Sequence, residues 1–507
     1  MIGFVGTLSN DALMPVHQAL FDSILSGDAQ SRILVPDAEL QTVQTTLLTT
    51  AIAFANTAGG KVLIGVDDKT GEILGLNADY LPHVVNTIRD AILDACTPQI
   101  PHSLHVVPVG DKTIVELEIY PGHETPYYLK SKKPETGTFI WVNGTTKEAD
   151  AYWLKELQFA GSRRTFDQQW VRGTSYLSAT EIEAFCDMLH QEALKNAEGQ
   201  DIRPIKLQTL ISWGVVSQNG DKIFPTHAFY LLRGDHPIFK TASILCARFP
   251  SNDRSTFLDR KAFNGSLFEQ FHHAFDWIQG ILQMRSAIIG KSRTDFFELP
   301  LEAIREVLTN ALCHRSYLYD GASIKVSIFP DRLEFSSPGP LPTSISLNKL
   351  MLGYTFFRNP AIAAAFKYVG LIGEWPSGLP RARRLMATWG LSDPEAEDLG
   401  AAIVIRLRRP DDAWPNPVTQ KAILDFQRHG TEALPQAPLQ PMRTQSLDAL
   451  VLQHLREDPT LSINALADTL HTSTGTIRGV MTKLKREGKL VRIGQRQTGL
   501  WQVIDPE

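Results

Sequence analysis

The chain has 507 residues, more than one hydrophobic core usually supports, so we expect three or four domains. Its 43% hydrophobic and 21% charged residues are typical of a folded globular protein and exclude extensive disorder. The formal charge of −5 excludes a uniformly basic nucleic-acid coat, so any site for a polyanion must be local. The four cysteines lie far apart without a CxxC pair, which argues against a zinc ribbon and a disulfide framework and favours a reduced cytoplasm. No run of about 18 apolar residues occurs, so we expect no membrane partner.

Apolar periodicity and turn residues predict a small α+β domain early in the chain. A helical arm is expected at residues 1–34, and residues 41–56 predict a helix that stops at Gly59-Gly60. Three apolar or alternating runs predict strands at 61–66, 113–119 and 138–142. Together these segments place the domain at residues 35–165.

The middle of the chain alternates helical and strand-like segments. A mixed connecting region is expected at 166–300, helical near 176–200. A further unit at 301–410 begins with a predicted helix at 301–315 and continues in three predicted strands, 323–329, 332–336 and 402–408. Frequent prolines mark residues 411–445 as a linker, within which residues 418–428 suit one helix.

Residues 446–507 predict three helices, at 447–455, 462–470 and 474–487, followed by two short strands around a basic tip. This order is that of a winged helix-turn-helix. The third helix carries short hydroxyls and long cations on one face, which suits phosphate anchoring and major-groove reading of duplex DNA. The expected nucleic-acid contacts, including one from the tip, are Thr476, Arg478, Thr482, Lys483, Lys485, Arg486 and Arg496. The alternative is a protein-binding winged helix whose basic face is only solvated.

The run AIAFANTAGGKVLIGVDDKTGEILGL at 51–76, with WVNGTTK at 141–147, resembles the Schlafen AlbA-type domain, a family described as DNA-binding. The shared features are a helix ending in AFANxxGG, a strand leading into GVDD, and a return through GxxxGL. The resemblance covers about residues 35–160. On physical grounds, Asn56 can bridge the helix end, and the two glycines permit a backbone conformation closed to residues with a Cβ.

The same resemblance implies a metal-dependent nuclease in members that combine two glutamates of an ExxxxEFK stretch with an aspartate of the GVDD turn. This chain has Asp67 and Asp68 but lacks the paired glutamates. A metal-assisted cut needs several convergent carboxylates, so we expect binding rather than cutting, with the aspartates bracing a turn. If the chain is a nuclease, Asp67 and Asp68 are the expected catalytic residues.

Several runs in the middle of the chain together resemble a RecG-like C-terminal ATP-binding domain of the GHKL type. They are CARFPSNDRSTFLDRKAFNG (246–265), REVLTNALCHRSY (305–317), DRLEFSSPGPLP (331–342), RNPAIAAAF (358–366) and GLIGEWPSGLPRARRLM (370–386). This resemblance covers about residues 205–410 and implies an α/β sandwich that binds ATP and Mg²⁺. The expected fold class is therefore α+β multidomain, with an AlbA-type domain, a GHKL-like sandwich and a winged helix-turn-helix.

By this resemblance, Glu306 orients the attacking water, and Asn310, four residues further on the same helical face, contributes to Mg²⁺ and phosphate binding. The other residues expected to bind the nucleotide are His314, Arg315, Gly339 and Gly378. The alternative is that Glu306 and Asn310 are ordinary exposed helix positions. Pro376 stands where the family has a lid-loop glycine, and it donates no N–H, so we expect ATP binding with little hydrolysis. A purely structural domain is the alternative.

These modules favour a cytoplasmic transcription regulator that binds duplex DNA and senses a nucleotide. GHKL domains often pair, and a two-fold homodimer would place two winged helices on neighbouring half-sites. The enzymatic alternatives are a Schlafen-like nuclease acting on tRNA, other RNA or DNA, as in phage defence, and a weak ATPase.

Overall fold

The fold belongs to the predicted α+β multidomain class, and its described residues fall in two compact units, Met1–Ala437 and Pro438–Glu507. The computed structural model describes residues 34–35, 40–67, 72–142, 144–162, 164–197, 201–235, 241–289, 292–319, 321–342, 347, 350, 357–373, 378–411, 414–415, 417–430 and a discontinuous part of 451–504. The predicted arm at 1–34 lies almost wholly outside these residues. None of the helices in the described part of the chain is long and apolar enough to cross a membrane.

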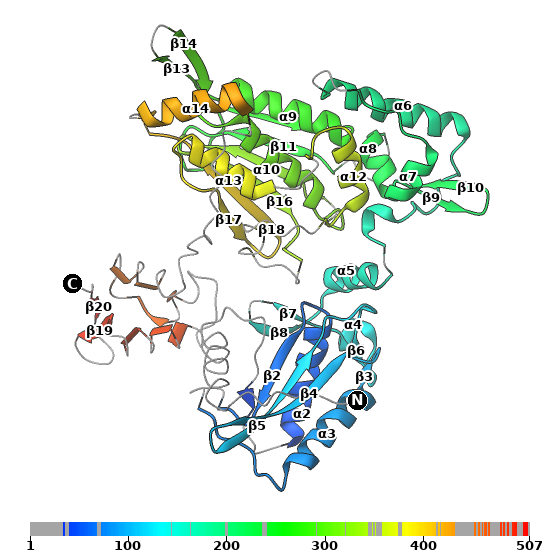
Figure 1. Ribbon diagram of the computed structural model, residues 1–507, viewed down its shortest axis with the longest axis vertical. Helices are drawn as coiled ribbons and strands as arrows, with labels where there is room; N and C mark the ends of the chain where they lie inside the picture. Colours follow the sequence, from blue (N-terminus) through cyan, green and yellow to red (C-terminus); the bar gives the residue numbers. More distant parts are fainter. Residues whose placement is uncertain are drawn as a thin grey trace, which may run out of the picture. The chain divides into compact units, whose positions relative to one another are not determined.

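A four-stranded sheet in the order β1-β2-β5-β4 forms the first domain (Figure 1). Helices α2 (Leu40–Ala55) and α3 (Leu81–Ala95) pack over one face, where Phe54, Val62 and Ile92 are buried in a common core. The buried positions of α3 recur at helical spacing, which explains why that face turns to the sheet. The strands are β1 (Leu34–Val35), β2 (Gly60–Ile64), β4 (His102–Val109) and β5 (Lys112–Ile119).

The AFANTAGG run forms the end of α2 and the turn into β2. Asn56 is buried, and its Nδ2 donates to the carbonyls of Tyr127 at 2.8 Å and Phe139 at 2.9 Å. Its Oδ1 accepts from the Tyr127 N–H at 2.7 Å, so the amide bridges the helix end to two later segments. Gly59 has φ +78°, and a Cβ there would lie 2.7 Å from the Ile119 carbonyl oxygen. Glycine is therefore required at this close approach.

Short elements complete the first domain, and two of the strand pairs are β3 with β6 and β7 with β8. The last helix begins at Ala151, and the side chain of Asp150 just before it accepts from the Trp153 N–H at 2.9 Å and caps it. The elements are β3 (Cys96–Thr97), β6 (Tyr128–Leu129), α4 (Pro134–Gly137), β7 (Phe139–Val142), β8 (Thr145–Glu148) and α5 (Ala151–Gly161).

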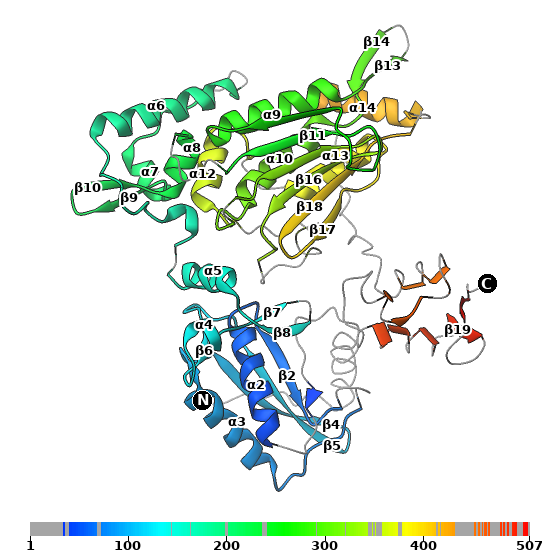
Figure 2. The ribbon, with the colours of Figure 1, turned by 180° about the vertical axis from the view of Figure 1, so that it is seen from behind.

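A small helical subdomain follows, and its hairpin β9–β10 lies at an outer end of this unit (Figures 1 and 2). The hairpin turns at Asn219-Gly220-Asp221, where Gly220 has φ +60°. The elements are η1 (Phe166–Gln168), α6 (Ala179–Lys195), α7 (Leu207–Trp213), β9 (Val216–Asn219), β10 (Lys222–Pro225) and α8 (His227–Arg233).

A six-stranded sheet in the order β12-β11-β15-β16-β18-β17 forms the next domain, and α9, α10 and α13 cover one of its faces (Figures 1 and 2). Two of its strands, β11 and β12, come from the predicted connecting region at 166–300. The sheet therefore extends beyond 301–410, because β11 pairs in parallel with β15. The strands are β11 (Ile244–Arg248), β12 (Asp259–Phe263), β15 (Ile324–Ile328), β16 (Arg332–Pro338), β17 (Glu395–Asp398) and β18 (Ala402–Arg408).

The two faces of this sheet differ in chemistry. Along β16, Leu333 and Phe335 are buried, while Arg332 and Glu334 point to the opposite face, as alternation along a strand requires. The remaining elements are α9 (Leu267–Ile281), the hairpin β13 (Met284–Ile289) and β14 (Ser292–Phe297), α10 (Leu301–His314), α12 (Pro360–Tyr368), α13 (Gly378–Thr388) and α14 (Pro417–His429).

The amino end of α12 is capped by a residue far away in sequence. Asp167 of η1 is buried, and its Oδ2 accepts from the N–H groups of Ala361 at 2.8 Å and Ile362 at 3.1 Å. The helix's own N-cap residue, Asn359, instead donates to the Cys313 carbonyl at 2.9 Å, and so helps to close the end of α10. Asp167 thus supplies the acceptor that the local sequence does not.

The second unit, Pro438–Glu507, has its own small core. Leu455, Ile477, Met481 and Trp501 are among its buried residues. The last two strands, β19 (Leu490–Ile493) and β20 (Leu500–Val503), pair antiparallel and form the predicted hairpin. Many residues of the three predicted helices lie outside the described part, so the winged helix-turn-helix stays a prediction.

Candidate nucleotide site and nucleic-acid interface

Glu306 and Asn310 lie one turn apart on α10, on the face that packs against α13. Two observations fix this direction. Glu306 forms an ion pair with Arg381 of α13, and a Cβ on Gly378 would lie 3.4 Å from Asn310 Nδ2. The amino end of α13 therefore lies beside Asn310, and the N–H groups at a helix amino end attract anions such as phosphate.

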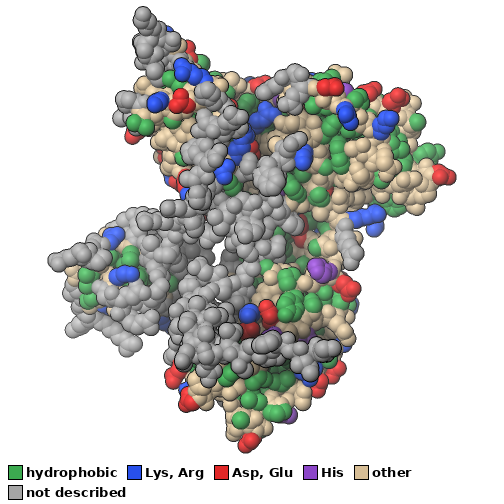
Figure 3. Space-filling model, viewed as in Figure 1, with side chains coloured by type: hydrophobic (Ala, Val, Ile, Leu, Met, Phe, Trp, Pro, Cys, Tyr) green, Lys and Arg blue, Asp and Glu red, His purple; other side chains and the backbone are tan. Residues whose placement is uncertain are grey.

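The Glu306 carboxylate is already paired. Its Oε1 accepts from Arg381 Nη1 at 2.7 Å, and the two side chains are only 18% and 26% exposed. Burial raises the pKa of Glu306 above its ordinary value, and the neighbouring Arg381 guanidinium opposes that rise. Lys and Arg side chains gather over the helical face of this unit, near α13 (Figure 3). A carboxylate paired with a guanidinium is a weaker base than an equally buried carboxylate without such a partner.

Gly339, one of the residues expected to bind the nucleotide, packs against a buried arginine. It has φ +107°, and a Cβ there would lie 2.6 Å from Ser316 Cβ and 2.7 Å from Arg358 Nη1. Arg358 donates from Nη1 to the His314 carbonyl at 3.1 Å and from Nη2 to the Pro340 carbonyl at 2.7 Å. These contacts fix the turn after β16 against the end of α10 and require glycine at position 339.

His314 and Arg315 occupy the carboxyl end of α10. Burial, with the charge of Arg358, lowers the pKa of His314 to about 4, so the imidazole is neutral at pH 7. Arg315 is 2% exposed, and its Nη2 donates to the carbonyls of Thr241, at 3.4 Å, and of Ala322. Because these carbonyls precede β11 and β15, Arg315 holds the starts of two parallel strands together.

The structure thus brings Glu306, Asn310 and Gly378 together. His314 and Arg315 lie about two helical turns from Glu306. No group of three His, Cys, Asp or Glu side chains that could hold a metal ion occurs among the described residues. The roles of these residues toward ATP and Mg²⁺ stay predictions.

The described part of the GVDD run, residues 65–67, pairs with the segment that starts at Glu72. Asp67 donates its N–H to the Glu72 carbonyl at 2.8 Å, and Val66 bridges to Ile73. Gly65 has φ +99°, a backbone conformation that favours glycine. Asp68 lies outside the described residues, and the nuclease role of both aspartates is untested by this geometry.

Two of the seven expected nucleic-acid contacts of the second unit are described, Arg478 and Lys485, and both are exposed. Lys485 Nζ lies 4.6 Å from the centre of the Trp501 ring, and the Arg492 guanidinium lies 4.8 Å from it. Lys485 and the hairpin residue Arg492 thus place two cations against one tryptophan ring. The others lie outside the described residues: Thr476, Thr482, Lys483, Arg486 and Arg496.

These features define a chain that joins an AlbA-like α+β domain to a GHKL-like sandwich. The family described as "Schlafen, AlbA_2" matches residues 35–150, and the family described as "Putative ATP-dependent DNA helicase recG C-terminal" matches residues 321–407. The chain therefore carries a Schlafen AlbA_2 domain and a RecG-type C-terminal domain, which confirms both resemblances. Both domains indicate nucleic-acid binding, and the second indicates nucleotide binding.

The helix that carries Glu306 and Asn310 precedes the matched range 321–407, so the match does not include it. The crystal structure of the DIP2311 protein from Corynebacterium diphtheriae is similar at 20% identity over 97% of each chain, with a TM-score of 0.41. No curated protein matches the chain significantly.

Two arginines lie beside these residues, Arg381 and Arg358. The sequence left Arg381, with Arg383 and Arg384, open between binding phosphate and forming a solvated helix face, and it predicted no role for Arg358. The run PRARR that contains Arg381 is visible in the sequence, but its pairing depends on how α13 packs against α10. Arg358 binds backbone carbonyls, and such a contact leaves no signal in residue spacing.

Proposed function

We propose that this protein is a nucleic-acid-binding transcription regulator whose second unit binds duplex DNA and whose RecG-type domain senses a nucleotide. The observation that carries the proposal is the concentration of positive charge at residues 474–496, with seven Lys or Arg against one Glu in a chain of net charge −5. The two nucleic-acid-related domains support it. A homodimer would present two such surfaces to neighbouring half-sites.

Replacing Arg478 by alanine is expected to weaken duplex binding and to reduce the slope of log affinity against log salt by about one. The reason is that one phosphate contact and its released counterion are lost. Fluorescence anisotropy with a labelled duplex from 50 to 200 mM salt measures both quantities. Lys367→Ala, an exposed cation of α12, is the control and should change neither.

The same samples, incubated with Mn²⁺ and labelled tRNA or DNA, test the alternative nuclease function, which the Schlafen match favours. Equal salt slopes for Arg478→Ala and the parent chain would contradict the assigned recognition helix. If the parent chain cleaves the nucleic acid and Asp67→Ala does not, the proposed function would be that of a nuclease and not that of a regulator.

For the nucleotide, the donor set fits Mg²⁺·ATP in kind: an amide oxygen at Asn310, a carboxylate at Glu306 and a helix amino end for phosphate. Bound Mg²⁺ would screen the phosphate charge, Asn310 would hold the ion, and Glu306 would accept a proton from water. We expect hydrolysis to be slow because Arg381 neutralises Glu306.

Asn310→Ala is expected to weaken binding of Mg²⁺·ATP at least about tenfold, the usual effect of removing one ligand or its support at a metal site. Glu306→Gln should bind the nucleotide as the parent does, because it changes proton transfer rather than contact. Calorimetry with Mg²⁺·ATP measures both variants. Asn86→Ala, which removes an amide from the distant helix α3, is the control; no heat of binding in the parent chain would reject the nucleotide function.

A further inference from the structure

An aromatic and cationic patch lies on the hairpin β9–β10 and on the segment that pairs with it. Trp170 is 43% exposed and Tyr176 is 56% exposed, although large aromatic side chains are mostly buried in folded proteins. Phe224 and Lys222 contact these rings, and Arg172 lies between them in the sequence. Lys222 and Arg172 are exposed. We call these five residues the hairpin patch.

The patch is ordered by ring contacts. The Trp170 and Phe224 rings meet edge to face with centroids 4.9 Å apart, and Lys222 Nζ lies 5.0 Å from the centre of the Tyr176 ring. Backbone pairing holds the two segments in register, since the Leu177 N–H donates to the Ile223 carbonyl at 2.7 Å. The hairpin therefore positions the segment that carries Trp170 and Tyr176.

The cations of the patch lack the partners that other arginines of this unit have. Neither Lys222 nor Arg172 forms an ion pair with a carboxylate of the described residues, whereas Arg233, nearby in sequence, pairs with Asp235 at 2.7 Å. Asp221, in the turn, is the one acidic residue within β9–β10 and its turn. The patch therefore offers π-faces with positive charge beside them.

We propose that the hairpin patch binds single-stranded nucleic acid, with unpaired bases stacked on Trp170 and Tyr176 and phosphates beside Lys222 and Arg172. Stacking on aromatic rings combined with backbone cations is how single strands are bound without sequence preference. A duplex keeps its bases stacked on each other and cannot use these rings. The inference rests on the proposed nucleic-acid function and extends it to a second, distinct contact.

The test is anisotropy of the full chain with labelled dT20 and U20 single strands and with a labelled duplex. The double variant Trp170→Ala/Tyr176→Ala is expected to weaken single-strand binding by roughly tenfold or more, with an unchanged salt slope, because stacking releases no counterions. Lys222→Ala should instead lower the slope by about one. Tyr176→Phe, which keeps the ring, should bind single strands as the parent does.

Phe257→Ala is the matched control, because Phe257 is 47% exposed and belongs to the same unit but lies outside the patch. Tryptophan emission of the parent minus that of Trp170→Phe should be quenched by dT20 if a base stacks there. If the chain binds the duplex but not the single strands, the role of the hairpin patch is wrong and the proposed function stands. If it binds neither, both proposals are wrong. Loss of self-association in the double variant, with unchanged single-strand binding, would assign the patch to a second copy of the chain.

Discussion

Replacing Glu334 by alanine is expected to lower the free energy of unfolding by about 3–5 kcal/mol, the range for removing one partner of a buried ion pair. Its side chain is only 6% exposed and lies on the sheet face opposite the helices. Three guanidiniums contact it: Arg332 at 2.8 Å, Arg406 at 3.3 Å and Arg254. Without the carboxylate these cations would repel one another in a partly desolvated site.

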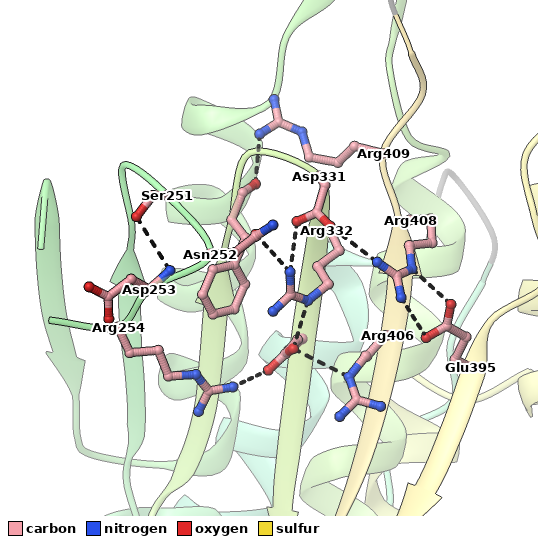
Figure 4. A network of polar contacts seen from close by, with 12 residues as sticks. Ser251, Asn252, Asp253, Arg254, Asp331, Arg332, Glu395, Arg406, Arg408 and Arg409 are labelled. Carbon is pink, nitrogen blue, oxygen red and sulfur yellow. Dashed lines mark hydrogen bonds and ion pairs between the residues drawn. The ribbon is translucent and has the colours of Figure 1, made fainter. Parts of the chain in front are cut away.

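Figure 4 shows how the network continues across the strands. Arg332 also donates to Asp331 and Asn252, each at 2.8 Å, and Arg408 forms a two-point contact with Glu395 at 2.8 and 3.1 Å. Glu395 is 41% exposed, which makes Glu395→Ala the matched control. That variant should cost less than about 1 kcal/mol, because exposed ion pairs contribute little.

The Glu334 carboxylate should also make stability depend on acid. Burial alone would raise its pKa, but the surrounding guanidiniums outweigh this and hold the pKa below its ordinary value. Its contribution is therefore present above the unfolded pKa and is lost as the pH falls through the lower folded value. Urea unfolding followed by circular dichroism between pH 3 and 7 measures this. Equal losses of stability in Glu334→Ala and Glu395→Ala would contradict the role of burial.

Asp167→Ala and Asp167→Asn are expected to have different effects. Alanine leaves two buried N–H groups of α12 without an acceptor. At about 1–3 kcal/mol for each unpaired buried group, the loss should be about 2–6 kcal/mol. Asparagine keeps an oxygen for both donors and removes the charge. Its Nδ2 can donate to Thr165, whose hydroxyl lies 2.5 Å from Asp167 Oδ1.

Because Asp167 titrates, the difference in stability between the parent chain and these two variants depends on pH. Burial raises the pKa of Asp167 from its ordinary 3.8 to about 6, although Thr165 and the α12 N–H groups oppose the rise. Since the folded pKa is raised, its contribution is fully present below the unfolded pKa and is lost as the pH rises through 6. A rise of that size in the pKa corresponds to a loss of about 3 kcal/mol in the free energy of unfolding.

Asp167→Asn should therefore gain stability relative to the parent as the pH rises from 4 to 7, whereas Asp167→Ala should be less stable than Asp167→Asn at every pH. Urea midpoints at four pH values give the comparison. A parent and an asparagine variant with parallel pH profiles would mean that Asp167 is not a buried charge.

The sequence predicted the elements with strong apolar periodicity. The strand at 402–408 has the predicted bounds, and the predicted helix at 301–315 differs from α10 by one residue. The helix α9 also has a readable start, because Ser266 and Glu269 form a capping box. The two-residue strands β3 and β6 had no such signal, since their pairing is decided by contacts distant in sequence.

The candidate site was predictable only in part for the same reason. The spacing of Glu306 and Asn310 placed both on one face of a helix, and the structure turns that face toward α13. The partner of Glu306 lies 75 residues away along the chain, so no local pattern could reveal that the carboxylate is neutralised.

The remote cap on α12 affects how the protein can be divided. A fragment that starts at α6, with the intention of isolating the six-stranded sheet, would lack η1 and with it the acceptor for two buried amides. The segment 165–168 therefore belongs to the sheet domain in folding, although it adjoins the first domain in sequence. Fragments that begin before Thr165 should fold into soluble protein, and fragments that begin after Asp167 should not.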